Sequence, residues 1–465
     1  MREATWLGTP FKVYQGDVPP YRIEVARRLE DRNFAAGRPR DAAVSLDDRA
    51  RVRSEVAREY FVREYGREPA DARELAATIA KHSRPKTTAV SGYDLAFSPV
   101  KSVSTLWAVA DPATAATIEG AHNSAVNDAL GFIEREALFT RVGAKGARQV
   151  DVTGLVATAF THRDSRAGDP DLHTHVALAN KVQTLDGRWL AIDGRVLFKA
   201  AVAASETYNT ALERHLSESL GVRFAVRSGA DVRRRPVREI VGVDPVLNQR
   251  WSTRRASIEV RSGELAKAFQ HDHGRPPTPV EAYALAQQAT LETRDAKHEP
   301  KSLLEQRTVW RGQAVEVLGS SVAVDRMVSA ALSPGGPTGQ KVTADWVAQI
   351  GILVVAEVQQ RRSTWQVWHL RSEAQRQARV ADIPANQIDT VVSLIVDEAL
   401  GRSIKLATDR DPIADPEELR RADGSSVYHV AGSDLFTSER ILAAEARIVA
   451  SAGRNDGRRI MPETV

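Results

Sequence analysis

Three histidines fall within fourteen residues of this chain, although the whole sequence contains only eleven. His162 stands before a predicted turn, and His173 and His175 stand after it. Residues two apart on a strand point to the same face, so we expect His173 and His175 to project together. Neutral imidazoles bind zinc and other transition metals, and three protein ligands leave positions open for a substrate. The pattern therefore favours a catalytic metal site over a chance His-x-His pair on a half-exposed strand.

The segments around these histidines indicate two neighbouring strands. Residues 149–162 are rich in β-branched side chains, and residues 172–182 alternate small and large apolar ones. Residues 163–171 contain a glycine and an Asp-Pro pair, which are typical of a turn. His162 would then end the first strand and lie beside the other two histidines.

A second block of residues accompanies the histidine block. It reads Gly92-Tyr-Asp94-Leu-Ala-Phe-Ser-Pro-Val-Lys101-Ser-Val-Ser, and the histidine block continues through Asn180-Lys181 and an Asp-Gly-Arg-Trp run at 186–189. Together the two blocks resemble the motifs of the MobF-type conjugative relaxases, which carry the TrwC-like relaxase domain and belong to the HUH endonucleases. The resemblance covers residues 92–298, with a weaker likeness beyond.

This resemblance implies an α+β fold, in which an antiparallel palm-like sheet is flanked by helices and carries the metal. It implies that His162, His173 and His175 hold a divalent metal, which we expect to be Mg, Mn or Zn. Asp94 is then the catalytic carboxylate, which orients one ligand histidine, expected to be His173, or accepts the proton of the nucleophile. The expected partners are single-stranded DNA at a transfer origin, relaxosome accessory proteins and the coupling protein.

The nucleophile in such enzymes is a tyrosine near the N-terminus, and this chain begins without the family's tyrosine motif. A Tyr hydroxyl, whose ordinary pKa is about 10, needs a base or a nearby positive charge to attack at neutral pH. Tyr14 and Tyr21 are the only early tyrosines, and neither stands in that motif. We therefore expect the catalytic tyrosine to lie upstream of Met1.

Several basic residues are candidates for DNA contact. Lys101 follows the Asp94 strand at a turn, and Arg166 and Lys181 flank the histidine hairpin. Trp251 and Arg254 combine an aromatic ring with a guanidinium, as single-stranded DNA binding requires. The alternatives are a solvated lysine at 101 and a solvated helical face with one buried tryptophan.

Three other motifs carry no site in this interpretation. His122 falls within a predicted helix and is expected to be an ordinary helical residue, and the His-Asp-His run at 271–273 should end a helix, where residues two apart diverge. Residues 335–341 resemble a phosphate-binding loop but lack its spacing and its preceding strand.

The remaining pattern predicts three domains. Residues 1–90 read as a helical insertion, residues 91–301 as the catalytic, DNA-gripping domain, and residues 302–465 as a linker that precedes a helicase not present in this chain. Capping signals and apolar spacing predict helices that start at Ser45, Asp111 and Thr278, a helix over 200–220, and three helices between 345 and 400. Short strands at 403–407 and 426–430 would complete a winged-helix-like region.

Composition limits the function classes further. The 465 residues carry 64 Lys and Arg against 60 Asp and Glu, a formal net charge of +4, so any basic DNA-binding surface must be local. The absence of cysteine excludes disulfides and thiolate ligands and agrees with a cytoplasmic protein. No signal peptide or spanning segment is recognisable, so no membrane insertion is expected.

The sequence thus predicts a site- and strand-specific DNA nicking-joining transesterase of conjugative plasmid transfer. Two alternatives share its DNA partner: a non-catalytic, metal-dependent single-stranded DNA-binding fragment, and a rolling-circle replication initiator. A three-histidine oxygenase or hydrolase acting on a small molecule is a further class, and it would show no affinity for DNA.

Overall fold

The computed structural model describes residues 18–83, 90–227, 235–295, 299, 301–333, 340–381, 383–406 and 416–454. The chain divides into two compact units, Met1–Ser91 and Gly92–Val465. No helix among these described residues is long and apolar enough to cross a membrane.

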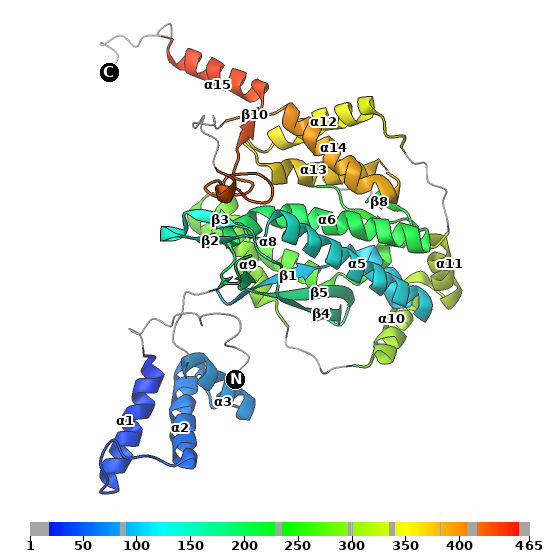
Figure 1. Cartoon of the computed structure of the whole chain (residues 1–465). Coiled ribbons are helices and arrows are strands. Elements are labelled where there is room, and N and C mark those ends of the chain that lie inside the picture. Colours follow the sequence, from blue (N-terminus) through cyan, green and yellow to red (C-terminus); the bar gives the residue numbers. More distant parts are fainter. Residues whose placement is uncertain are drawn as a thin grey trace, which may run out of the picture. The chain divides into compact units, whose positions relative to one another are not determined.

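The first unit is a small helical group, coloured blue in Figure 1. Its helices are α1 (Pro20–Ala35), α2 (Leu46–Tyr65) and α3 (Ala72–Ser83). As predicted, α2 is capped by Ser45, whose hydroxyl accepts the backbone N–H of Asp48, and it ends at Gly66 in the left-handed conformation. Tyr21, Val52 and Val56 are among the residues of its small core.

The second unit begins with a mixed α+β region that carries the histidines (Figure 1). In chain order its elements are β1 (Gly92–Phe97), α4 (Lys101–Val109), α5 (Pro112–Glu136), β2 (Thr140–Val142), β3 (Arg148–Val150), β4 (Ala157–Asp164), β5 (Pro170–Ala179), β6 (Val182–Gln183), β7 (Trp189–Leu190), α6 (Gly194–Leu220), β8 (Phe224–Val226) and β9 (Arg238–Ile240). Helices continue with α7 (Pro245–Arg250), α8 (Thr253–His273), α9 (Pro279–Glu292), α10 (Leu303–Leu318) and α11 (Ser321–Ala331).

The central sheet has three antiparallel strands in the order β1-β5-β4. The predicted hairpin is present, because β4 and β5 pair on either side of a turn at 165–169. Along β5, Leu172, Thr174 and Val176 are buried and face the helices, whereas the alternate residues are more exposed. Strand alternation thus gives β5 one core face and one open face, whereas β4 is exposed along most of its length.

The helical layer behind the sheet forms where the sequence predicts it. Asp111 caps α5 and accepts the backbone N–H groups of residues 113 and 114, with Pro112 at the first helical position. Helix α6 carries Tyr208, Leu212 and Leu216 into the core and ends at Gly221. The same core includes Trp310 of α10 and Val324 and Met327 of α11, so it extends past residue 302, where we predicted a domain limit. The three predicted domain limits stay predictions.

The last part of the second unit is a helical group, coloured yellow to red in Figure 1. It contains α12 (Ala344–Gln359), α13 (Val367–Val380), α14 (Ile388–Gly401), β10 (Ile404–Lys405), β11 (Phe436–Thr437) and α15 (Glu439–Ala452). The three predicted helices are confirmed as α12, α13 and α14. The winged-helix assignment stays a prediction.

One predicted strand is wrong. Ser426 makes only an isolated bridge with Arg420, the residues after it form a turn, and β10 pairs with β11 instead. The reason is local: the backbone N–H of Arg421 donates to Ser425 O and that of Gly424 donates to Arg421 O, which folds this segment on itself. The apolar residues of this segment, such as Val427, are therefore buried within a compact loop and not in a sheet.

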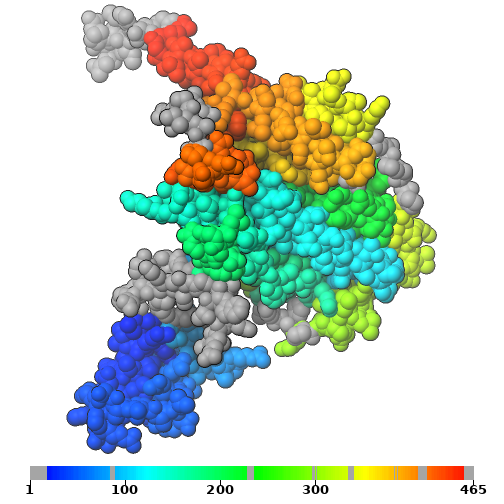
Figure 2. Space-filling model, in the orientation of Figure 1, coloured from blue at the N-terminus to red at the C-terminus, as the bar shows by residue number. Residues whose placement is uncertain are grey.

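A small ribbon stands out from the body of the second unit. Strands β2 and β3 form it, and Figure 2 shows it in cyan, projecting from the surface. Its turn contains Lys145 with a positive φ of 55°, which is uncommon for a residue other than glycine.

Candidate active site

The open face of the sheet brings the three histidines together. In the register, His162 of β4 lies opposite His173 of β5, and His175 lies between Phe160 of β4 and Ala96 of β1. The ring centroids of His162 and His173 are 5.1 Å apart, and each lies 5.5 Å or 5.4 Å from that of His175. Three imidazoles from two strands thus converge on one point of an exposed surface.

Asp94 contacts a different histidine from the one we predicted. Its two carboxylate oxygens lie 2.8 Å and 2.9 Å from Nδ1 of His175, not His173. The register explains this, because Asp94 pairs with Ala177, whose next same-face neighbour on β5 is His175. His173 lies four residues along the strand from Ala177 and is out of reach.

His173 has its own support from the turn that precedes it. Its Nδ1 lies 2.7 Å from the backbone oxygen of Asp171. The same turn is fixed by Lys101, whose ammonium donates to Pro170 O at 2.9 Å and lies 3.7 Å from the Asp171 carboxylate. The Nδ1 atoms of His173 and His175 are thus occupied, which leaves their Nε2 atoms to face a ligand.

The base of the hairpin is also tied to the helices. The carboxylate of Asp169 is buried and accepts hydrogen bonds from the backbone N–H and the hydroxyl of Thr253, at the start of α8. Burial raises the pKa of this carboxyl. Gly168 O accepts the indole N–H of Trp310 at 2.9 Å. The turn that delivers the histidines is therefore held rigidly.

The distances between the three ring centres can be compared with those around a metal ion. Ligand nitrogens about 2.0–2.1 Å from a zinc-like ion in tetrahedral directions place imidazole centres roughly 5 Å apart, as here. Among the residues that the structure describes, however, no three or more His, Asp or Glu side chains are placed so that they could hold a metal ion together. The donor set and its Nδ1 partners support a metal site, which we treat as a proposal.

Replacing Asp94 with asparagine should weaken metal binding. An outer carboxylate fixes the tautomer and orientation of a ligand imidazole, and its loss typically lowers affinity about 10–100-fold. The side chain of Asp94 is 65% exposed, so folding should not suffer. Isothermal titration of the Asp94→Asn protein with Mn²⁺ measures the effect.

Asp186→Asn is the matched control, because this aspartate is similarly exposed and pairs with Arg188 on the same unit. It should bind Mn²⁺ like the unaltered protein. Equal Mn²⁺ affinity in both variants would show that Asp94 does not orient a ligand.

His122 lies directly behind the histidine face. It is fully buried, with Nδ1 2.8 Å from the Tyr208 hydroxyl and Nε2 2.8 Å from Oγ1 of Thr174, the residue between His173 and His175. As predicted, His122 is not one of the converging histidines. It connects α5, α6 and β5 through a buried hydrogen-bonded chain.

The protonation of His122 makes stability depend on pH. Burial lowers its pKa from 6.5 to about 4, so between these values the unfolded chain binds a proton that the folded protein excludes. We expect the free energy of unfolding to fall by up to about 3 kcal/mol as the pH drops through this window. Urea denaturation of the protein and of His122→Gln at pH 7 and near pH 4.5 measures it. The variant should lose this part of the pH dependence, and identical pH dependence would contradict the assignment.

Two candidate tyrosines, Tyr21 and Tyr93, have their side chains engaged in packing. Tyr21 is 2% exposed and its hydroxyl donates to Arg53 O at 2.7 Å, so it is a core residue. Tyr14 lies outside the described residues. Tyr93 neighbours Asp94 on β1 but points to the other side of the sheet, and burial raises its pKa. Within the described β1, β4 and β5, no tyrosine shares the histidine face.

The basic residues that we predicted to bind DNA differ in how far their side chains are engaged within the protein. Lys101 and Arg166 both donate to backbone oxygens, the latter to Asp295 O at 2.8 Å. Arg254 is partly buried and reaches Thr290 O at 3.4 Å. Lys181 lies in the short link between β5 and β6. Their roles in binding DNA remain proposals.

Trp251 does not have the predicted position. It is fully buried, and its indole N–H donates to Gln313 Oε1 at 2.8 Å. The ring fills the core under α10 and cannot stack on a base. Of the basic residues near it in the sequence, Arg250 and Arg255 are exposed and Arg254 is partly buried.

The structure adds an aromatic residue that the sequence argument missed. Phe160 lies opposite His175 and is 53% exposed, on the same face as the histidines. Its position two residues before His162 on a strand was the available signal. An exposed ring beside the site suits contact with a base.

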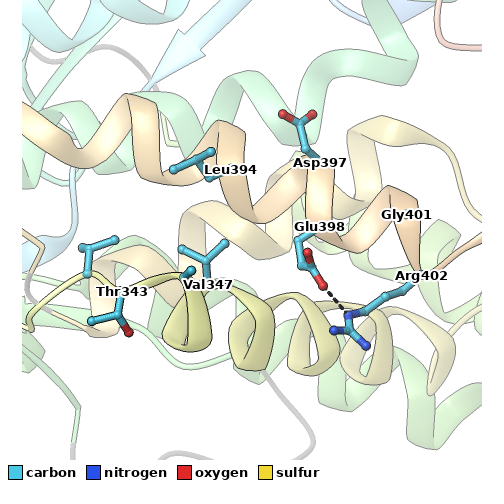
Figure 3. Close-up of a pocket in the computed structure, with 9 residues that line it drawn as sticks. Thr343, Val347, Leu394, Asp397, Glu398, Gly401 and Arg402 are labelled. Atoms are coloured by element: carbon cyan, nitrogen blue, oxygen red, sulfur yellow. Dashed lines mark hydrogen bonds and ion pairs between the residues drawn. The ribbon is translucent and has the colours of Figure 1, made fainter.

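A pocket lies away from the histidines, between α12 and α14. Its volume is about 860 Å³, and Figure 3 shows Val347 and Leu394 on its walls and the ion pair between Glu398 and Arg402. Its lining residues, all within the described chain, include no histidine. We therefore place the candidate chemistry on the sheet.

Comparisons with known proteins find relatives that are similar to part of this chain. The TraI multifunctional conjugation protein of Escherichia coli is 33% identical over 217 residues, which are 44% of this chain and 11% of TraI. TraI of strain K12 is 30% identical over 203 residues, again 11% of its length. The matches thus span about a tenth of these relatives.

Solved structures of the conjugative relaxase TrwC are also similar in sequence. A metal-free complex with oriT DNA is 26% identical, covering 55% of this chain and 88% of that chain, with a TM-score of 0.41. A metal-bound complex is 26% identical, covering 55% and 86%, with a TM-score of 0.40. The profile of the TrwC relaxase family matches residues 33–317, more than half of the sequence. The chain belongs to the TrwC relaxase family.

Proposed function

We propose that this chain is the relaxase part of a conjugation protein and cuts one DNA strand at a transfer origin. The observation that carries the proposal is the convergence of His162, His173 and His175 on the open sheet face. Its support is membership of the TrwC relaxase family. Site and strand specificity, the accessory proteins and the coupling protein belong to the proposal.

The chain's own residues would orient the scissile phosphate. His162, His173 and His175 would hold a divalent metal, which when bound polarises the phosphate and offsets charge on its oxygens. Asp94 keeps the Nδ1 of His175 engaged, and the Asp171 carbonyl does the same for His173. Both rings therefore present Nε2 toward the open face without having to reorganise.

A tyrosine hydroxyl would attack the phosphorus, forming a 5′-phosphotyrosyl bond and releasing the 3′-oxygen as a hydroxyl once it gains a proton. One phosphoester replaces another, so the cut can be resealed. The nucleophile would be a tyrosine that β1, β4 and β5 do not carry on this face.

Incubating the purified chain with Mn²⁺ and a supercoiled plasmid that bears its own transfer origin tests the proposal. A nicked plasmid joined to protein and resistant to SDS is the expected product, and peptide mapping then identifies the tyrosine, including Tyr14. DNA binding without an adduct would support the non-catalytic binding fragment. Failure to bind the origin strand at all would contradict the relaxase assignment.

A further inference from the structure

A second exposed aromatic lies near the site, on the other side of β1. Phe198 of α6 is 71% exposed, and its ring meets Tyr93 edge-to-face with centroids 5.8 Å apart. It borders a cavity of about 500 Å³ that β2, β7 and the start of α6 enclose. The ring of Phe198 is thus held by Tyr93 on one side and open to the cavity and solvent on the other.

The packing at this point depends on a glycine. Gly194 begins α6, and a Cβ there would overlap the hydroxyl of Tyr93. Any other residue there would displace the side chain of Tyr93, which packs on Phe198. The glycine therefore sets the position of Phe198 against the edge of the sheet.

The charge around the cavity is positive. Asp193 is buried, and its carboxylate accepts hydrogen bonds from Arg141 Nε at 2.7 Å and Gln149 Nε2 at 2.9 Å. The side chain of Arg195 is 77% exposed, with its Nε 4.0 Å from Asp193, too far for a hydrogen bond. The guanidinium of Arg195 thus faces solvent beside the ring of Phe198.

Strand β1 connects this cavity with the candidate active site, because Tyr93 contacts Phe198 and the next residue, Asp94, contacts His175. Tyr93 and Asp94 are consecutive on β1 and point to opposite faces of the sheet, and β1 is an edge strand. A DNA strand that leaves the histidine face over this edge would therefore reach Phe198 within a few nucleotides. A ring beside an exposed guanidinium, which the described residues hold only by a long 4.0 Å ion pair with Asp193, matches a base with its phosphate.

We propose that Phe198 and Arg195 form a subsite for one nucleotide of single-stranded DNA, with the base stacked on the ring and its phosphate on the guanidinium. This inference rests on the proposed DNA-relaxase function. Stacking needs only the π-face of a base, so the subsite accepts any base and holds the strand rather than reading its sequence.

Titration of fluorescent single-stranded oligonucleotides in EDTA tests the subsite in the full chain without cleavage. A 2-aminopurine is moved along the strand one position at a time. Phe198→Ala should weaken binding about tenfold and remove the quenching of one 2-aminopurine position. Phe198→Tyr should keep the affinity and the quenching of the unaltered protein, whereas Phe198→Leu should lose both.

Arg195→Ala provides an independent measurement. Removing one phosphate contact should lower the slope of log affinity against log salt by about 0.7 for a single strand. Tyr283→Ala, which removes a ring that is 67% exposed on α9, is the control and should leave both quantities unchanged.

The outcomes separate the two proposals. If the unaltered chain binds no single-stranded DNA, the proposed function fails. If it binds and Phe198→Ala binds equally well, or if Phe198→Leu keeps the affinity of the unaltered protein, the stacking subsite is overturned while the relaxase proposal stands.

Discussion

Replacing His173 with alanine should abolish Mn²⁺ binding and nicking while leaving most of the affinity for DNA. His173 is central on β5, 5.1 Å and 5.4 Å by ring centroid from His162 and His175, so its loss leaves two ligands. Loss of a ligand should exceed the roughly 10–100-fold penalty of losing an outer partner. Isothermal titration with Mn²⁺ and the plasmid assay measure the two losses.

His271→Ala is the matched control for this variant. His271 also belongs to a His-x-His pair, but it lies near the end of α8, where residues two apart diverge. It should bind Mn²⁺ and nick as the unaltered protein does. Loss of DNA binding together with metal binding in His173→Ala would indicate that the histidines are structural.

Replacing Glu206 with glutamine should destabilise the second unit by about 3–5 kcal/mol. Glu206 of α6 contacts Arg376 at 2.7 Å and Arg379 at 2.6 Å, and all three side chains are at most 12% exposed. Burial alone would raise the pKa of Glu206, but the two arginines outweigh it and lower the pKa. Removing the carboxylate leaves Arg376 paired only with Glu373 at 2.8 Å and Arg379 only with Glu213 at 3.5 Å. Urea denaturation followed by tryptophan fluorescence measures the loss.

Glu398→Gln is the comparison for Glu206. Glu398 pairs with Arg402 one turn along α14, where its side chain is 34% exposed. Such a solvated pair should contribute about 0.5 kcal/mol or less. If both variants lose the same stability, the Glu206 network does not hold α13 against α6.

The histidine hairpin was predictable because its evidence is local. Strand alternation fixes that His173 and His175 share a face, and turn composition between 163 and 171 brings β4 alongside. The helices with side-chain caps, such as α5 after Asp111 and α9 after Thr278, were predictable for the same reason.

Contacts set by register and burial were not predictable. The partner of Asp94 depends on which residue of β5 lies opposite it, and a shift of two residues would select a different histidine. Trp251 and its arginines suggest a DNA surface in sequence, but α10 covers the ring. Phe198 gave no signal, because its exposure depends on how Gly194 seats α6 against β1.

A crystal of the chain soaked in Mn²⁺ tests the central claim most directly, through the anomalous scattering of the metal. We expect one anomalous peak on the open sheet face, from a Mn²⁺ ion coordinated by Nε2 of His173 and His175 and by the ring of His162. A peak at another group of residues, or none at these three histidines at saturating Mn²⁺, would contradict it.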